Sequence, residues 1–155
     1  MLKTAPTIPL MELALAQAEA AAGRGEVPVG AVIVDSATGK VLAAAGNRTE
    51  ELADPTAHAE VLAIREACAG RGEPRLPDCD LYVTLEPCGM CAAAISFARL
   101  RRVYFGAYDV KGGGVEHGPR FFHQATCHHA PEIYGGLEER RAAELLKEFF
   151  RRRRL

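Results

Sequence analysis

Two cysteines three residues apart, Cys88 and Cys91, directly follow a proline and most constrain what this chain can fold into. Ahead of them, residues 81–85 are apolar and β-branched enough to form a short buried strand. Behind them, residues 91–98 lack glycine and proline and are rich in alanine, the strongest helix former. Pro87 is therefore predicted to lie in the first turn of a helix, where its missing N–H is not needed.

The predicted helix start favours metal binding by both thiols. Residues three apart on a helix are neighbours on one face, so Cys88 and Cys91 should lie side by side. A helix N-terminus carries partial positive charge and free N–H groups, which lower the pKa of a thiol and favour the metal-binding thiolate. The two cysteines are therefore predicted to form half of a zinc site.

The second half of the predicted site lies upstream, at His58 and Glu60. His58 offers a neutral imidazole as a third ligand, whereas Glu60, two residues on, does not share its helix face and is a poor co-ligand. One histidine and two cysteines leave the fourth tetrahedral position to water, as in catalytic rather than structural zinc sites. Zinc lowers the pKa of such a water to roughly 7, and Glu60 is predicted to shuttle its proton to a leaving group.

The complete pattern, His-x-Glu followed by Pro-Cys-x-x-Cys, resembles that of zinc-dependent nucleobase deaminases. The alternatives are a structural zinc knuckle or two core cysteines. Either alternative would leave Glu60 without a role, which favours the catalytic interpretation.

Composition limits the protein class. The chain has 155 residues, the usual size of one domain, and its 48% hydrophobic and 25% charged content is typical of soluble globular proteins. No apolar run approaches the roughly 18 residues needed to span a bilayer, and no secretory pattern opens the chain. We therefore expect a single domain over residues 1–155, a cytoplasmic location, and spare reduced thiols at Cys68, Cys79 and Cys127. The net charge of −1 means that any nucleic-acid site must be a local patch.

Hydrophobic periodicity and turn residues predict the order of elements along the chain. Helices are predicted at residues 7–22, 87–98 and 137–151, with a short helix at 120–124. One more helix is predicted to be capped by Asp54 or Thr56 and to end near residue 67. The predicted strands cover residues 28–35, 41–45, 81–85, 103–107 and 132–134. Loops are expected at residues 70–80 and 109–118, the latter flexible because of three consecutive glycines. This order implies a mixed sheet with helices on both faces.

Beyond the zinc pattern, the chain resembles the bacterial tRNA-specific adenosine deaminases. The resemblance is densest at residues 27–32, 46–48, 54–60, 81–91, 105–107 and 149–151. It implies a three-layer α/β/α cytidine deaminase-like fold with a five-stranded mixed sheet, one Zn²⁺ per chain and a homodimer. It also implies conversion of adenosine to inosine at the wobble position of a tRNA anticodon loop.

The resemblance also implies roles for individual residues. His58, Cys88 and Cys91 would hold zinc, and Glu60 would move protons. Asn47 would hydrogen-bond the flipped base, and Asp109 would lie near the RNA backbone. The anticodon loop would be contacted by the C-terminal segment, which contains Phe149, Phe150 and the following arginines, including Arg152 and Arg153. Two features depart from the family pattern: Gly89 between the cysteines, and residues 112–129, which differ from better-known members.

Simpler interpretations stand beside these roles. Asn47 and Asp109 are common turn-forming residues. Phe149 lies on the inward stripe of its predicted helix, so Phe150 is the better candidate for stacking on a base. The four arginines at 151–154 could be a solvated helix end or a phosphate-binding patch.

Other functions also remain open. Residues 127–129 (Cys-His-His) invite a second metal site, but such loop residues are usually only solvated. A deaminase of free guanine, cytosine or a nucleoside would keep the zinc site without needing a basic tail. A non-catalytic, zinc-stabilised RNA-binding module would not need Glu60.

Overall fold

The computed structural model describes residues 7–153, and Arg154, part of the predicted basic tail, lies outside them. The helices are α1 Thr7–Gly23, α2 Ala59–Arg71, α3 Gly89–Ala98 and α4 Glu139–Arg153, with a short 3₁₀ helix, η1, at Phe121–His123. The strands are β1 Gly30–Asp35, β2 Val41–Gly46, β3 Cys79–Leu85, β4 Arg102–Ala107 and β5 Glu132–Tyr134. None of the helices in this part of the chain is long and apolar enough to cross a membrane.

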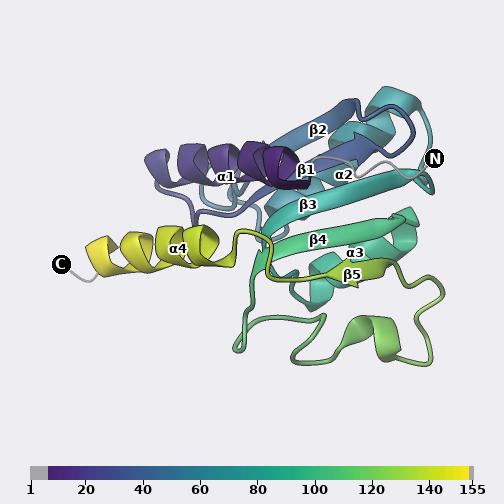
Figure 1. Cartoon of the computed structure of the whole chain (residues 1–155). Helices are drawn as coiled ribbons and strands as arrows, with labels where there is room; N and C mark the ends of the chain where they lie inside the picture. Colours follow the sequence, from purple (N-terminus) through teal and green to yellow (C-terminus); the bar gives the residue numbers. More distant parts are fainter. Residues whose placement is uncertain (1–6, 154–155) are drawn as a thin grey trace.

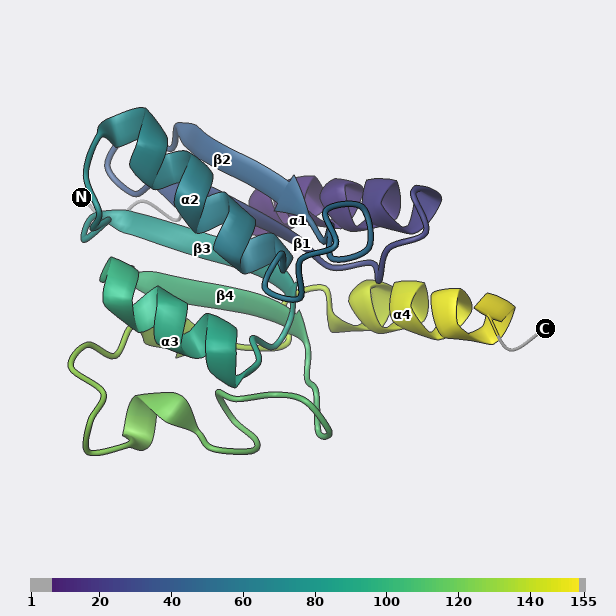
Figure 2. The ribbon, with the colours of Figure 1, turned by 180° about the vertical axis from the view of Figure 1, so that it is seen from behind.

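The five strands form one mixed sheet in the order β2-β1-β3-β4-β5. β1 is antiparallel to both β2 and β3, whereas β3, β4 and β5 run parallel. Helices α1 and α4 cover one face of the sheet (Figure 1), and α2 and α3 cover the other (Figure 2). The predicted three-layer α/β/α fold with a five-stranded mixed sheet is confirmed.

The core lies on both faces of the sheet because the central strands are apolar at consecutive positions. In β1, Ala31 and Ile33 pack toward α2 and α3, whereas Val32 and Val34 pack toward α1 and α4. Side chains alternate between the faces of a strand, so an uninterrupted apolar run is what a sheet covered on both sides requires. The helices α2 and α3 approach closely because they face the sheet with small residues, mainly alanines.

Several predicted boundaries differ from the structure by one or two residues, such as the start of β1 at Gly30 and of α4 at Glu139, and three other differences have a clear cause. The predicted cap of α2 at Asp54 or Thr56 is wrong, because Asp54 instead accepts hydrogen bonds from the backbone N–H and hydroxyl of Thr56 and closes a turn. Pro87 lies one residue before the N-cap of α3 rather than in its first turn. β3 begins at Cys79, two residues earlier than predicted, because Cys79 pairs with Asp35 of β1.

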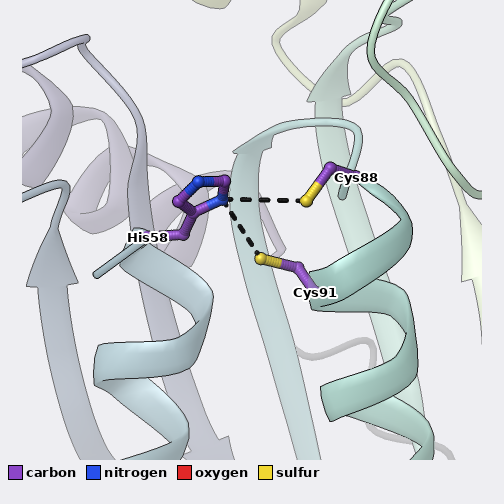
Figure 3. A group of neighbouring side chains, drawn as sticks. All are labelled: His58, Cys88 and Cys91. Carbon is purple, nitrogen blue, oxygen red and sulfur yellow. Dashed lines mark hydrogen bonds between the residues drawn. The ribbon is translucent and has the colours of Figure 1, made fainter. Parts of the chain in front are cut away.

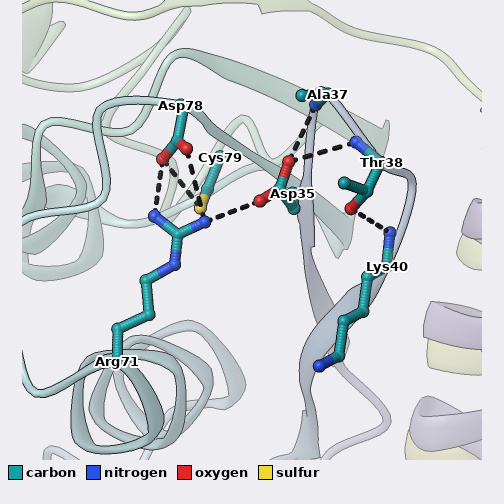
Figure 4. A network of polar contacts seen from close by, with 7 residues as sticks. All are labelled: Asp35, Ala37, Thr38, Lys40, Arg71, Asp78 and Cys79. Atoms are coloured by element: carbon teal, nitrogen blue, oxygen red, sulfur yellow. Dashed lines mark hydrogen bonds and ion pairs between the residues drawn. The ribbon is translucent and has the colours of Figure 1, made fainter.

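A polar network joins Arg71, at the end of α2, to Asp35 of β1 and to Asp78 (Figure 4). The Arg71 guanidinium donates to Asp35 at 2.8 Å and to Asp78 at 2.6 Å. Asp35 also accepts from the backbone N–H groups of Ala37 and Thr38, which closes the β1–β2 turn. One arginine therefore joins the end of α2 to Asp78, seven residues on, and to the β1–β2 turn, 36 residues earlier.

We expect Arg71→Met to lower the free energy of unfolding by about 1–2 kcal/mol, because the partly buried Asp35 and the exposed Asp78 both lose a charged donor. Urea denaturation would measure this loss. Arg65→Met is the matched control on the same helix: Arg65 is 61% exposed and makes one contact of 4.0 Å, so its replacement should change stability by less than about 0.5 kcal/mol. Equal effects of the two substitutions would contradict the proposed tie.

Candidate metal centre and catalytic site

The N-terminal ends of α2 and α3 lie at the same edge of the sheet, the edge from which α4 extends (Figure 2). His58 is the N-cap of α2 and Cys88 is the N-cap of α3, both with extended backbone. Cys91 follows in the first turn of α3 and is fully buried. The structure thus brings together the three predicted metal ligands, which point toward one another (Figure 3).

The spacing of the three ligand atoms suits a tetrahedral metal ion. His58 Nδ1 lies 3.7 Å from Cys88 Sγ and 3.4 Å from Cys91 Sγ, and all three atoms lie within 4.8 Å of one another. Zinc bonds of about 2.3 Å to sulfur and 2.0–2.1 Å to nitrogen, at tetrahedral angles, put the two ligand atoms about 3.6 Å apart. Two thiols and one imidazole are also ligands that zinc prefers, so the residues present fit this metal.

The electrostatics of the two thiols favour ionisation at the cluster. A hydrogen bond from Cys91, together with His58, lowers the pKa of Cys88 to about 4. The pKa of Cys91 is raised, because it supplies that hydrogen bond and is buried. Hydrogen bonding to Cys88 in turn raises the pKa of His58. A divalent cation binds cysteine as thiolate, so metal binding at this cluster would release the thiol protons.

Glu60 lies in the first turn of α2 beside this cluster and is only 4% exposed. Burial raises the pKa of its carboxyl group to about 7, although hydrogen bonding to Cys91 and the nearby His58 partly oppose this shift. A carboxyl group with a pKa near neutrality can both accept and return a proton. Glu60 thus has the location and the environment that a proton shuttle needs.

Asn47 joins the end of β2 to the start of α2. Its side-chain oxygen accepts a hydrogen bond of 2.8 Å from the backbone N–H of Ala59, the residue between His58 and Glu60. Asn47 therefore satisfies one free donor of the helix N-terminus. This structural contact places the side chain next to the metal cluster, and its amide NH₂ remains a hydrogen-bond donor.

The other predicted RNA contacts lie farther along the chain. Asp109 follows β4, and its side chain accepts from the backbone N–H of Gly112, the turn role that was the simpler interpretation. Phe150 is exposed near the end of α4, whereas Phe149 is half-buried, as predicted. Within residues 7–153, none of these side chains contacts the metal cluster directly.

The basic tail is partly paired within the chain. Arg151 and Arg152 both donate to Glu148, one helical turn earlier. Arg153 lies over the ring of Phe149, 4.4 Å from its centre, and donates to the carbonyl of Gly25. One glutamate faces two arginines, so the end of α4 keeps a net positive charge.

Sequence reasoning missed two buried carboxylates that organise loops on either side of the site. Glu26 accepts from the backbone of Glu50 and Glu51, and Glu86 accepts from several amides after β4. Burial alone would raise the pKa of each, but these hydrogen bonds hold both pKa values below their usual range. The local sequence contained one sign that Glu86 is buried, which is its position between Leu85 and Pro87 at the end of an apolar segment.

The region from 109 to 129 departs from expectation. The loop predicted to be flexible at Gly112–Gly114 instead has Gly113, Gly114 and Val115 buried, so that prediction was wrong. At residues 127–129, the Cys127 thiol donates to the carbonyl of His129, and the His129 ring contacts the carbonyl of Leu100. These side chains hold the segment against α3 and β4.

Comparison with known proteins agrees with this geometry. Residues 7–107 match the family described as "Cytidine and deoxycytidylate deaminase zinc-binding region". The tRNA-specific adenosine deaminase of Agrobacterium fabrum is 63% identical over 145 residues, which cover 94% of each chain. A structure solved in a study of A-to-I editing by tRNA:A34 deaminases superposes with a TM-score of 0.87 and 62% identity, covering 89% of this chain and 99% of the other.

The fold alone is also shared more widely. A guanine deaminase from Nitrosomonas europaea superposes with a TM-score of 0.81 at 23% identity, covering 96% of this chain and 86% of the other. At 23% identity, the similarity to the guanine deaminase shows a common fold. The first two proteins are 63% and 62% identical to this chain, so their similarity covers the amino-acid sequence as well as the fold. The chain therefore belongs to the zinc-dependent cytidine and deoxycytidylate deaminase family and, within it, to the tRNA-specific adenosine deaminases.

Proposed function

We propose that this protein hydrolyses adenosine to inosine at the wobble position of a tRNA anticodon loop. The observation that carries the proposal is the cluster of His58, Cys88 and Cys91 with the buried Glu60 beside it, in a chain so close to named tRNA-specific adenosine deaminases. A site with three protein ligands is typical of catalytic zinc. Because tRNA is the proposed substrate, we also infer a cytoplasmic location.

His58, Cys88 and Cys91 would hold the zinc, which, when bound, supplies a Lewis acid and lowers the pKa of water toward neutrality. The Glu60 carboxylate would take a proton from the attacking water and deliver it to a ring nitrogen of adenine. The same carboxylate would then take the second proton, from the new hydroxyl group on C6, and deliver it to the departing amine, so that ammonia leaves and the C6 carbonyl remains.

Substrate positioning would come from residues around this cluster. The amide of Asn47, held beside α2 by Ala59, would hydrogen-bond a flipped-out base. An anticodon loop already presents unstacked bases, so no duplex has to be opened. Asp109, Phe150 and the arginines of α4 would contact the RNA outside the pocket, since α4 extends from the same edge of the sheet as the helix starts (Figure 2).

Replacing Arg152 and Arg153 by alanine tests whether the tail contacts RNA. If each arginine neutralises one phosphate, the double variant should bind an anticodon stem-loop more weakly, and its slope of log affinity against log salt should fall by about 1.4. The matched control, Lys40→Ala with Arg75→Ala, removes two exposed positive charges outside α4 and should leave the slope unchanged. Identical slopes for all three proteins would remove the tail from the RNA site.

The second candidate function is deamination of a free base such as guanine, because a guanine deaminase shares this fold. Turnover of an anticodon stem-loop should be compared with turnover of free adenosine, guanine and cytosine by the same preparation. We expect deamination of the stem-loop adenosine only. Faster turnover of a free base than of the stem-loop would favour the second function.

We also propose that two copies of this chain form a homodimer through α3. Its outer face carries Met90, Ala93, Ala94 and Phe97, at the spacing of one helical stripe, and Phe97 is 72% exposed. α3 contains no charged residue. An exposed apolar helix face with small central residues allows close packing against a second copy.

Phe97→Asp should convert the dimer into a monomer, because it places a charge within the proposed apolar contact. Light scattering at micromolar concentration would measure the mass. Leu13→Asp, which changes an exposed leucine on the opposite face of the sheet, should leave the dimer intact. A monomeric parent protein, or a dimeric Phe97→Asp variant, would contradict the proposed interface.

A further inference from the structure

The loop of residues 109–117, which follows β4, is folded around a single buried side chain. The Glu86 carboxylate, 1% exposed, accepts hydrogen bonds from the backbone N–H groups of Asp109 at 3.0 Å, Val115 at 3.2 Å, Glu116 at 2.8 Å and His117 at 3.1 Å. The ring of His117 donates to the same carboxylate at 2.8 Å. One carboxylate therefore satisfies both ends of the 109–117 loop.

The middle of the 109–117 loop lies directly against the turn that carries Cys88. The N–H of Gly114 donates to the carbonyl of Pro87 at 2.8 Å. A side chain at Gly114 would come within 2.5 Å of the backbone nitrogen of Gly89, and one at Gly113 within 2.4 Å of the Glu86 carboxylate. Only glycines permit this approach, so the loop and the cysteine turn form one packed unit, beneath the start of α3 (Figure 2).

We propose that Glu86 is a positioning residue, which holds the 109–117 loop against the Cys88–Gly89 turn and thereby fixes the position of Asp109. The part concerning Asp109 and substrate rests on the proposed function; the part concerning the loop does not. Glu86 lies beside the metal turn in sequence but is directed toward the loop, so it acts through other residues rather than on the substrate.

A carboxylate suits this position because all its partners are donors. An ionised carboxylate offers only acceptor sites, enough for five hydrogen bonds when some are shared. Glutamine has nearly the same shape, but its NH₂ group would face backbone N–H groups and leave them unsatisfied. Unsatisfied buried donors are expensive, so the loop should open.

Glu26 is the matched control within the same chain. It is equally buried at 1% exposure, and it accepts from the Thr49 hydroxyl and from the backbone N–H groups of Glu50 and Glu51. It thus organises a different loop by the same chemistry. If each carboxylate acts on its own loop, Glu86→Gln and Glu26→Gln should affect different segments.

Amide hydrogen exchange of the zinc-loaded protein tests the proposal without any substrate. In Glu86→Gln we expect exchange at residues 115–117 to become about 10- to 100-fold faster, from the cost of unsatisfied donors, with residues 50–51 unchanged. Glu26→Gln should show the reverse pattern. Trypsin should also cut faster after the exposed Lys111 in Glu86→Gln alone. Unchanged exchange at 115–117 in Glu86→Gln, or equal acceleration there in both variants, would overturn the proposal.

Kinetics with an anticodon stem-loop provide the second measurement. For a positioning role through Asp109, we expect Glu86→Gln to raise KM about tenfold or more while kcat changes less and one zinc per chain is retained. A loss confined to kcat would overturn the link to Asp109. A parent protein that does not deaminate the stem-loop would refute the proposed function, whereas the exchange result would still assign the loop to Glu86.

A second pair of variants covers the case in which Glu86→Gln does not fold. Gly113→Ala leaves Glu86 intact but pushes a methyl group into its carboxylate, and should accelerate exchange at residues 115–117 in the same way. Gly112→Ala is its control, because the added methyl group would meet only the end of the Asp109 side chain, at 3.1 Å. Equal exchange in the two alanine variants would overturn the proposal.

Discussion

Replacing Glu60 by glutamine should lower kcat by about 10⁴-fold or more while the protein keeps its fold and its zinc. General acid–base catalysis is usually worth about 10²- to 10⁴-fold, and here one carboxyl group is proposed to serve several proton transfers in each turnover. Glutamine preserves the shape of the side chain but cannot carry the proton. Because burial disfavours the charged form of Glu60, the variant should be at least as stable as the parent.

Turnover of the stem-loop, zinc content and thermal unfolding of the same preparation measure these three effects together. Glu66→Gln is the control, because Glu66 is an exposed glutamate on the same helix. It should match the parent in all three measurements. A Glu60→Gln variant that retains more than a tenth of the parent's activity would mean that another group moves the protons.

Replacing both Cys88 and Cys91 by alanine should abolish zinc binding and all measurable activity. Only His58 would remain of the three ligands, and a single imidazole does not retain zinc against dilution. A protein with its metal bound is also stabilised relative to the unfolded chain, by about 4 kcal/mol when the metal is at 1,000 times its dissociation constant. We therefore expect the variant, and the parent after chelation, to unfold at lower temperature.

Elemental analysis should find one zinc per chain in the parent and none in the double variant. Cys68→Ala is the control: Cys68 lies on α2 outside the cluster, and burial raises the pKa of its thiol, so it should not bind metal. Its zinc content should equal that of the parent. Full zinc and activity in the double cysteine variant would disprove the ligand assignment.

The layered fold could be predicted because its signals are local. Consecutive apolar residues in the central strands indicated a sheet covered on both faces, and the alternation of helices and strands indicated the layers. The boundaries were less predictable. β3 starts at Cys79 because of its pairing with β1, and Asp54 closes a turn rather than capping α2. A partner distant in the chain decided the start of β3, whereas the Asp54 turn is made with Thr56, two residues on.

The metal ligands could be predicted for the same reason. The positions of Cys88 and Cys91 at one helix start are set by spacing within a single turn, and His58 and Glu60 are separated by only one residue. The roles of Glu86 and Glu26 could not be predicted. Their partners are mostly backbone N–H groups, which every residue except proline possesses, and which lie 23–31 residues away in sequence.

The sequence by itself thus identified the residues that we propose for metal binding and proton transfer, because side-chain type and helical spacing are properties of short segments. Only the tertiary structure decided how the surroundings are held. The 109–117 loop looked flexible from its glycines, yet those glycines are what allow it to pack on Gly89 and Glu86. Likewise, Arg153 reaches Gly25 across 128 positions of the chain. Such contacts depend on which surfaces the sheet brings together, and no local pattern of residues records that.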